Sequence, residues 1–388
     1  MAALLIMLIL TSCAVQNGGS SSVQSEGESM PGVTAEFEKM NFTAEDIALY
    51  EEILANQSEW VAKSLQLSNG AIPMYDRPAE GIEHKNKVVP YFSCFTALGL
   101  LETDGNQETV KKYINWHFAH INTSADVNGV VGTIYDYYIE NKDLSEEPTD
   151  DYDSTDSYGA LFLTLLRRYA EVTSDNALLT DNRDKIDLAA EAMMSTELNG
   201  LTWAKPTYKV KYLMDNAEVI KGLEDAVWIY KNILNNSEKQ SLYQEKYDLV
   251  LSTLEDNLWD AQKEKYYLGK QPAAVMPTDL SIFYPDAVCQ LYPAVWGVIN
   301  PDSERAVMLY NRFAEQFPNW TKGDFSASFP WAMLAYCAAY MGDYKRADEY
   351  VKYMKTEYID NNNQSPWYSM ESGCMMMAAG LLLKAATN

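Results

Sequence analysis

Hydrophobic and polar residues divide this chain into two kinds of segment. In one kind, charged residues flank an apolar stripe at helical spacing, which predicts amphipathic helices with one buried face. The other kind is apolar almost throughout, and such helices must be enclosed on every side. The amphipathic segments are 43–68, 106–120, 181–198, 237–259, 302–317 and 343–360. The apolar segments are 88–101, 154–172, 212–234, 284–299, 326–341 and 366–383.

The two kinds of segment alternate along the chain and therefore form six helical pairs. Six polar-sided helices around six enclosed ones make a double-layered barrel, the (α/α)6 toroid. A helical solenoid is the main alternative, but it would show a fixed repeat length, and the spacing of these pairs varies. We expect an all-α toroid of six helical hairpins. Within 122–151, the run VNGVVGTIYDYY adds a short β-hairpin that turns near Asn128 and Gly129.

Composition narrows the possible partners. The chain of 388 residues has 55 acidic and 30 basic side chains, a formal net charge of -25. Nucleic acids need a positive surface and are excluded, and a strongly anionic polysaccharide is disfavoured. Aromatic residues make up 12%, led by 27 Tyr and 9 Trp. These rings suit a surface that stacks on sugars, and they suit core packing equally well.

The first residues are typical of a bacterial lipoprotein signal. An apolar run ends in Leu10-Thr11-Ser12-Cys13, which predicts lipidation of Cys13. An ordinary secretory signal is the alternative. We expect a signal at 1–13, a flexible tether at 14–34 and the folded domain at 35–388, with the protein lipid-anchored on the extracellular face of the bacterial cell membrane. We expect it to be a monomer.

The remaining cysteines and the histidines favour packing over chemistry. Each of the four other cysteines lies in an apolar stretch outside any CxxC pair, which predicts buried free thiols, with disulfides as the alternative: Cys94, Cys289, Cys337 and Cys374. His117 and His120 are more typical of a packed pair than of metal ligands. The sequence contains no GxGxxG, P-loop, GxSxG or HExxH motif, so we expect neither a cofactor nor a metal.

Candidate chemistry gathers where the apolar helices begin. In a toroid the inner helices run parallel, so their N-terminal ends meet at one mouth, fed by the longest loops. The charged residues there are Glu83, Lys87, Asp153, Asp156, Asp215, Glu218, Asp286, Asp324 and Glu371, with Asp136 added by the hairpin. The aromatic residues there are Tyr91, Tyr135, Tyr158, Tyr284, Trp331 and Trp367.

Several of these acids have a purely structural interpretation. Asp215 and Glu218 are spaced as a capping box, and Asp286 follows Pro285 in a first turn, where an acid complements the helix dipole. Asp324 lies in a loop, where contact with water is enough to account for it. Glu371 lies one turn inside its helix, which predicts a buried partner.

Asp153 and Asp156 are harder to explain as caps. Ser154 or Thr155 already suffices to cap the helix, so the two acids beside them favour a functional role. Paired carboxylates among stacking rings are what glycosidic cleavage needs. One protonates the leaving oxygen, and the other activates water or attacks the sugar.

From about residue 43 onward the chain resembles the six-hairpin (α/α)6 glycosidase superfamily and, more loosely, family 8 glycoside hydrolases. The local basis is DSTDSYGAL, an Asp-rich entry to the second inner helix. The resemblance implies that Asp153 or Asp156 holds the sugar at the cleavage point. It also implies a general acid before the preceding inner helix, where the nearest equivalent is Glu83, ahead of Tyr91.

We therefore expect a glycoside hydrolase acting on a neutral or amino-sugar glycan. Asp156 and Asp153 are the first candidates for the catalytic acids, followed by Asp215, Asp136 and Asp286. The expected substrate contacts are Tyr91, Tyr135, Tyr158, Lys87, Tyr284, Trp331, Trp367 and Glu371. A surface glycan-binding lipoprotein without catalysis is one alternative. A polysaccharide lyase or epimerase on the same toroid is the other.

Overall fold

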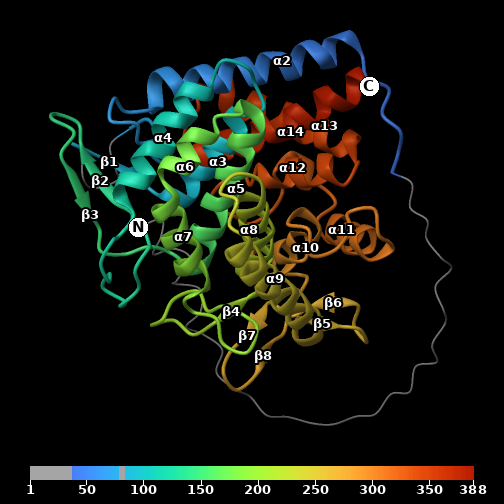
Figure 1. Ribbon diagram of the computed structural model, residues 1–388. Helices are drawn as coiled ribbons and strands as arrows, with labels where there is room; N and C mark the ends of the chain where they lie inside the picture. The colour runs from blue at the N-terminus through green and yellow to red at the C-terminus, as the bar shows by residue number, and fades with distance from the viewer. Residues whose placement is uncertain (1–36, 78–83) are drawn as a thin grey trace. The chain divides into compact units, whose positions relative to one another are not determined.

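The computed structural model describes residues 37–77 and 84–388 (Figure 1). Of the residues singled out above, Cys13 and Glu83 lie outside these ranges, as do the whole of the predicted signal and of the tether. The described residues belong to one compact unit, Phe37–Asn388.

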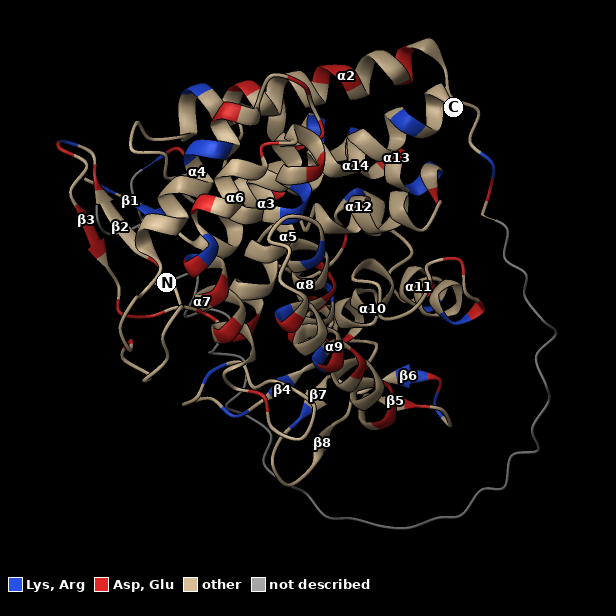
Figure 2. Ribbon diagram, in the orientation of Figure 1, with Lys and Arg blue, Asp and Glu red and all other residues tan. Residues whose placement is uncertain are grey.

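The helices follow the predicted alternation. The amphipathic, outer helices are α2 (Ala44–Glu59), α4 (Gln107–His120), α7 (Arg183–Met194), α9 (Ser237–Leu258), α11 (Glu304–Gln316) and α13 (Tyr344–Met354), with a short α6 (Asn176–Asp181) before α7. The inner helices are α3 (Pro90–Leu100), α5 (Thr155–Thr173), α8 (Leu213–Asn232), α10 (Tyr292–Val295), α12 (Met333–Tyr340) and α14 (Ser369–Thr387). In Figure 2 charged residues lie on the outer helices, on the loops and on the inner helices α5 and α8, whereas the inner helices α3 and α12 carry none.

The inner helices form a closed ring. Helix α5 packs between α3 and α8, α8 meets α10, and α14 packs on both α12 and α3. Apolar side chains before and within α10 share one small cavity with side chains of α12, which places these two helices side by side. This arrangement is the predicted (α/α)6 toroid. We call the end of the barrel at which the inner helices begin the mouth.

Glycines allow two pairs of inner helices to approach closely. A Cβ atom added to Gly222 of α8 would lie 2.6 Å from the Cα of Ala160 in α5, and one added to Gly99 of α3 would lie 2.6 Å from the Cα of Gly373 in α14. Such distances are shorter than real Cβ atoms tolerate. The ring therefore depends on the missing side chains at these crossings.

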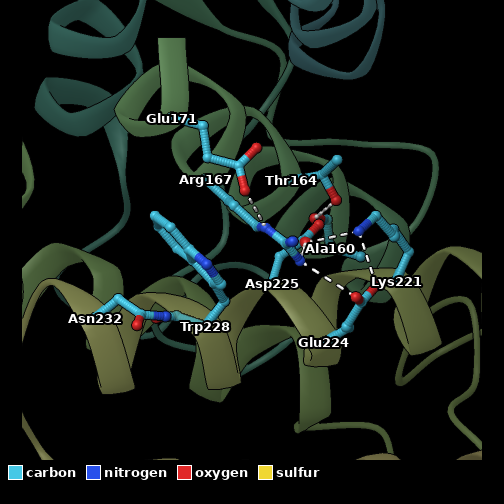
Figure 3. A network of polar contacts seen from close by, with 9 residues as sticks. All are labelled: Ala160, Thr164, Arg167, Glu171, Lys221, Glu224, Asp225, Trp228 and Asn232. Atoms are coloured by element: carbon cyan, nitrogen blue, oxygen red, sulfur yellow. Dashed lines mark hydrogen bonds and ion pairs between the residues drawn. The ribbon is translucent and has the colours of Figure 1, made fainter. Parts of the chain in front are cut away.

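One turn beyond the first crossing, away from the mouth, ion pairs fix α5 to α8 (Figure 3). The buried carboxylate of Asp225 accepts hydrogen bonds from Arg167 Nη1 at 2.9 Å and from Lys221 Nζ at 2.8 Å. Arg167 also binds Glu171 at 3.0 Å and lies over the ring of Trp228. Burial still raises the pKa of Asp225, so these opposite charges offset only part of the cost of burying it.

Two inner segments differ from the predicted continuous helices. In 284–299 the chain forms a π-helical turn at Phe283–Ala287 and then only the short α10, because Pro285 and Pro293 supply no backbone N–H to a continuous ladder. In 326–341 the helix begins only at Met333. The residues before it, which include Pro330, are not helical.

The β insert is present, but its strands are not those predicted. β1 (Lys85–Val88), β2 (Tyr137–Glu140) and β3 (Glu146–Pro148) form an antiparallel sheet in which Val88 is opposite Tyr137 and Tyr137 is opposite Pro148. Gly129 does turn the chain, at φ +81°, inside a loop that the Asp126 carboxylate holds through the N–H groups of Asn128 and Val130. Shorter strands β4 to β8 lie at Lys211–Tyr212, Trp259–Asp260, Lys265–Tyr266, Gly269–Lys270 and Val275–Met276.

The four cysteines of the described chain are buried and free, as predicted. Within the described residues, no helix combines the length and apolar character needed to cross a membrane.

The crossing of α5 and α8 gives a stability prediction. We expect Gly222→Ala to lower the free energy of unfolding by about 2 kcal/mol, because the new methyl group overpacks against Ala160. Gly380→Ala is the matched control on inner helix α14, where the atoms nearest to the new methyl would all belong to the side chain of Glu102, the terminal Oε2 first, and none to the backbone. Thermal denaturation of both variants tests this, and equal midpoints would contradict the role of the crossing.

Candidate active site

Four acidic side chains from two neighbouring inner helices meet at the mouth. Asp156 and Glu218 lie four residues before Ala160 and Gly222, so each stands one turn above the closest contact of α5 and α8, on the face that makes it. Asp153 lies three residues before Asp156, and Asp215 lies three residues before Glu218. We call these four residues the acid cluster.

The acids are not there to cap the helices. The N-cap residues are Ser154 for α5 and Tyr212 for α8, and within the described structure neither makes a side-chain capping bond. Asp215 lies inside the first turn of α8 rather than at its cap. The predicted capping box of Asp215 and Glu218 is therefore wrong. Asp156 accepts the N–H of Ser157 at 2.9 Å, and the positive end of the helix dipole favours its negative charge.

Burial and mutual repulsion raise the pKa values of the cluster. Burial raises the pKa of Glu218 to about 8, although the Tyr91 hydroxyl donates a hydrogen bond to its Oε1 at 2.6 Å. Burial also raises the pKa of Asp215 well above its usual value, and repulsion from Asp156 and Glu218 adds to this effect. Burial likewise raises the pKa of Asp156. Not all of these acids can be ionised at neutral pH.

The four acids of the cluster differ in their exposure to solvent. Asp153 is exposed and Asp215 partly exposed, whereas Asp156 is 0% and Glu218 3% exposed. Protein surrounds Asp153 closely enough to raise its pKa, while Lys205 and Lys87 act in the opposite direction. A molecule entering from solvent would therefore meet Asp153 and Asp215 first.

The β insert brings two predicted residues to the edge of the cluster. Lys87 Nζ lies 3.4 Å from Asp136 Oδ2, and the hydroxyl of Tyr158 donates to Asp136 Oδ1 at 2.9 Å. Burial raises the pKa of Asp136 to about 6, against the effect of Lys87. The ring of Tyr158 stacks on that of Tyr91 at 5.9 Å. Asp136 is thus buried and fully occupied by protein partners.

Four predicted site residues lie away from the cluster. Asp286 accepts a hydrogen bond from the backbone N–H of Asp279 at 2.7 Å. The exposed carboxylate of Asp324 accepts one from the side-chain amide of Asn319 at 3.3 Å. The Tyr135 hydroxyl accepts the N–H of Val127 at 2.9 Å within the insert. Trp367 is 0% exposed, stacks on Tyr358 and donates to Gln57 at 3.0 Å, so its ring is core and cannot serve as a sugar platform.

Trp331 is also placed differently from the prediction. It is 5% exposed and lies between Phe329, at a ring distance of 4.9 Å, and Tyr284, at 4.7 Å. The rings that reach solvent are therefore Tyr284 and Phe329, both partly exposed. Glu371 has the buried partner predicted for it, since it accepts the N–H of Ala332 at 2.5 Å. Burial raises the pKa of Glu371 to about 8.

Sequence reasoning missed Phe329, which stacks on Trp331, and Tyr368, which contacts Phe329. Phe329 and Tyr368 lie beside Trp331 and Trp367 at the starts of inner helices, so the rule that selected the tryptophans could have found them. The nonhelical conformation of 326–332, which sets the position of Phe329, was not predictable from the pattern of hydrophobic and polar residues. Among the described residues, no group of three or more His, Cys, Asp or Glu side chains is placed to hold a metal ion.

The raised carboxyl pKa values predict how stability depends on pH. The folded state holds the protons of Glu218 and Glu371 more tightly than the unfolded chain does. Stability is therefore greatest on the acidic side and falls as pH rises from about 4.5, an ordinary glutamate pKa, toward 8. Glu371→Gln should make this fall shallower, while the exposed Glu315→Gln should not. Urea denaturation across pH 5 to 8 measures both slopes, and identical slopes would contradict the burial of an ionisable group here.

No family model matches this sequence, and no curated protein matches it. Solved structures do match. One is titled only as a glycosidase, with 12% identity, 89% of this chain and 99% of that chain covered, and a TM-score of 0.63. A GH63 mannosylglycerate hydrolase of Thermus thermophilus, solved with glucose, has 13% identity, covers 84% and 99%, and scores 0.59. A GH76 α-mannanase of Bacteroides thetaiotaomicron has 11% identity, covers 87% and 97%, and scores 0.56. At these identities the likeness establishes the fold, and this chain has the (α/α)6 toroid on which these glycosidases are built.

Proposed function

We propose that this protein is a glycoside hydrolase whose active site is the acid cluster at the mouth. The observation that carries the proposal is the arrangement of four carboxyl groups from α5 and α8, two facing solvent and two buried behind them. Glycosidic cleavage requires one carboxyl group that is protonated and one that is ionised at the same pH. The structural likeness to three glycoside hydrolases supports the same reaction class.

Asp215 is the proton donor in this proposal. Its pKa is raised well above the usual value by burial and by the negative charges of Asp156 and Glu218, which favours the protonated form that a donor needs. It is also partly exposed, so a glycosidic oxygen can reach it. Its proton passes to that oxygen as the bond from the anomeric carbon to the leaving sugar breaks.

Asp153 is the ionised partner. It is the most accessible acid of the cluster, and Lys205 and Lys87 favour its charged form. As a base it takes a proton from the water whose oxygen bonds to the anomeric carbon, and the products are two free sugar hydroxyls. Asp156, the first candidate from the sequence, is 0% exposed and acts behind the pair by keeping the pKa of Asp215 high.

The surroundings of the cluster favour an uncharged glycan. Repulsion by several carboxylates would oppose the binding of an acidic sugar, so a neutral or amino sugar fits best. Tyr91 and Tyr284 are partly exposed and bordered by the acids, and they are the nearest stacking surfaces. Manno- and gluco-configured substrates are the first choices, because the similar structures include a mannanase and a mannosylglycerate hydrolase with glucose.

We further propose that Cys13 anchors the protein to the extracellular face of the membrane, where a glycan would be met. This rests on the sequence pattern alone. Cells fed a labelled fatty acid should incorporate the label into the full chain but not into Cys13→Ser. Equal labelling of the two would contradict the anchor.

The catalytic proposal is tested with the full chain on a panel of neutral and amino-sugar glycans, including α-mannan and mannosylglycerate. We expect reducing ends from at least one substrate. Asp215→Asn and Asp153→Asn should each lower kcat by at least about 100-fold, as loss of general acid–base catalysis does. Asp324→Asn, an exposed acid away from the cluster, is the control and should keep full activity.

The outcomes separate the alternatives. Unchanged kcat in Asp215→Asn would contradict its assignment as proton donor. Binding without turnover across the panel would favour the glycan-binding lipoprotein. An unsaturated product that absorbs in the ultraviolet would establish a lyase in place of a hydrolase.

A further inference from the structure

A continuous series of aromatic contacts runs along the mouth from one side of the acid cluster to the other. Tyr284 contacts Trp331, Trp331 stacks on Phe329, and Phe329 meets Tyr368 at 5.9 Å. Tyr368 meets Phe92 at 6.0 Å, and Phe92 meets Tyr91 at 6.4 Å. We call these residues the aromatic belt: Tyr284, Trp331, Phe329, Tyr368, Phe92 and Tyr91.

Both ends of the belt lie at the acid cluster. Tyr91 donates a hydrogen bond to Glu218, and burial together with the nearby charges of Asp153, Asp215 and Glu218 raises the pKa of Tyr284. Phe329 and Tyr368 lie in the middle of the series, furthest along it from the acids. All belt members except Trp331 are partly exposed residues that pack against the edge of the core.

The backbone beneath the belt is strained at one point. Trp331 has φ +55°, a left-handed conformation that is unfavourable for a bulky residue. Two neighbouring bonds hold the strained segment. Glu371 accepts the N–H of Ala332, and the hydroxyl of Tyr350 donates to the carbonyl of Pro330. The conformation turns Trp331 inward, where it supports Phe329 on one side and Tyr284 on the other.

Strain that is maintained by buried partners calls for a benefit elsewhere. Partly exposed rings beside carboxyl groups suit the apolar face of a sugar ring, with its hydroxyls at the polar edge. We propose that Phe329 and Tyr368 bind a second sugar unit, next to the one at the acid cluster. The substrate is then an oligosaccharide or polysaccharide rather than a simple monosaccharide glycoside. This inference rests on the proposed function, because it assigns the occupant of the same site.

Activity on substrates of different length tests the second subsite. With the full chain, kcat/KM should rise from an aryl monoglycoside to the trisaccharide of the same sugar. Phe329→Ala should lower kcat/KM for the trisaccharide about tenfold more than for the aryl glycoside, which is the scale of one lost stacking contact. Phe42→Ala is the control, because that ring packs on Tyr50 and Tyr344 in the outer layer. A length-independent kcat/KM, or an equal effect of Phe329→Ala on both substrates, would overturn the proposal.

A binding measurement keeps this test separate from the test of catalysis. Calorimetric titration of Asp215→Asn with mono-, di- and trisaccharides needs no turnover. Affinity that rises with length and falls about tenfold on adding Phe329→Ala would support the subsite even if no substrate were hydrolysed. Affinity unrelated to length would overturn it even in an active enzyme. Phe329→Leu is the second variant if the alanine variant fails to fold.

Discussion

The close crossing of α5 and α8 is the contact on which the site depends. Ala160 meets Gly222 across nothing larger than its own methyl group, so the two helices approach closely. Because both helices run in the same direction, residues one turn nearer the mouth are brought opposite one another. Those residues are Asp156 and Glu218. The repulsion within the acid cluster is thus a consequence of a glycine placed four residues further along the chain.

The same interface arranges its charges in opposite ways at its two ends. Away from the mouth, the buried carboxylate of Asp225 is paired with Arg167 of α5 and with Lys221 of its own helix, so opposite charges meet there. At the mouth, acid faces acid, and burial raises the pKa of Glu218 to about 8. Like charges in a buried position lower stability. Their presence at one end only, with compensating ion pairs at the other, is typical of a site in which stability is given up for chemistry.

Much of the fold could be predicted from the sequence, because it depends on periodicity. Polar-sided and apolar helices alternate so regularly that the toroid and nearly every helix can be derived from the pattern. The site was predictable only where it depends on helix starts, as for Asp153, Asp156 and Asp215. Whether an aromatic side chain faces solvent or the core depends on the local backbone conformation. The pattern therefore could not separate buried Trp367 from partly exposed Tyr368 next to it.

The segment where prediction failed most clearly is also the segment that shapes the mouth. An uninterrupted helix over 326–341 would have given Trp331 ordinary helical angles and carried Phe329 along the wall of the barrel. Instead Pro330 and the left-handed Trp331 hold 326–332 out of the helix, and Glu371 satisfies the N–H of Ala332 where the helix begins. Natural sequences follow local rules almost everywhere, because agreement among local preferences is what makes one fold stable. A departure that needs a buried carboxyl group to maintain it, and that brings aromatic rings to the edge of an acid cluster, is best understood as a requirement of binding.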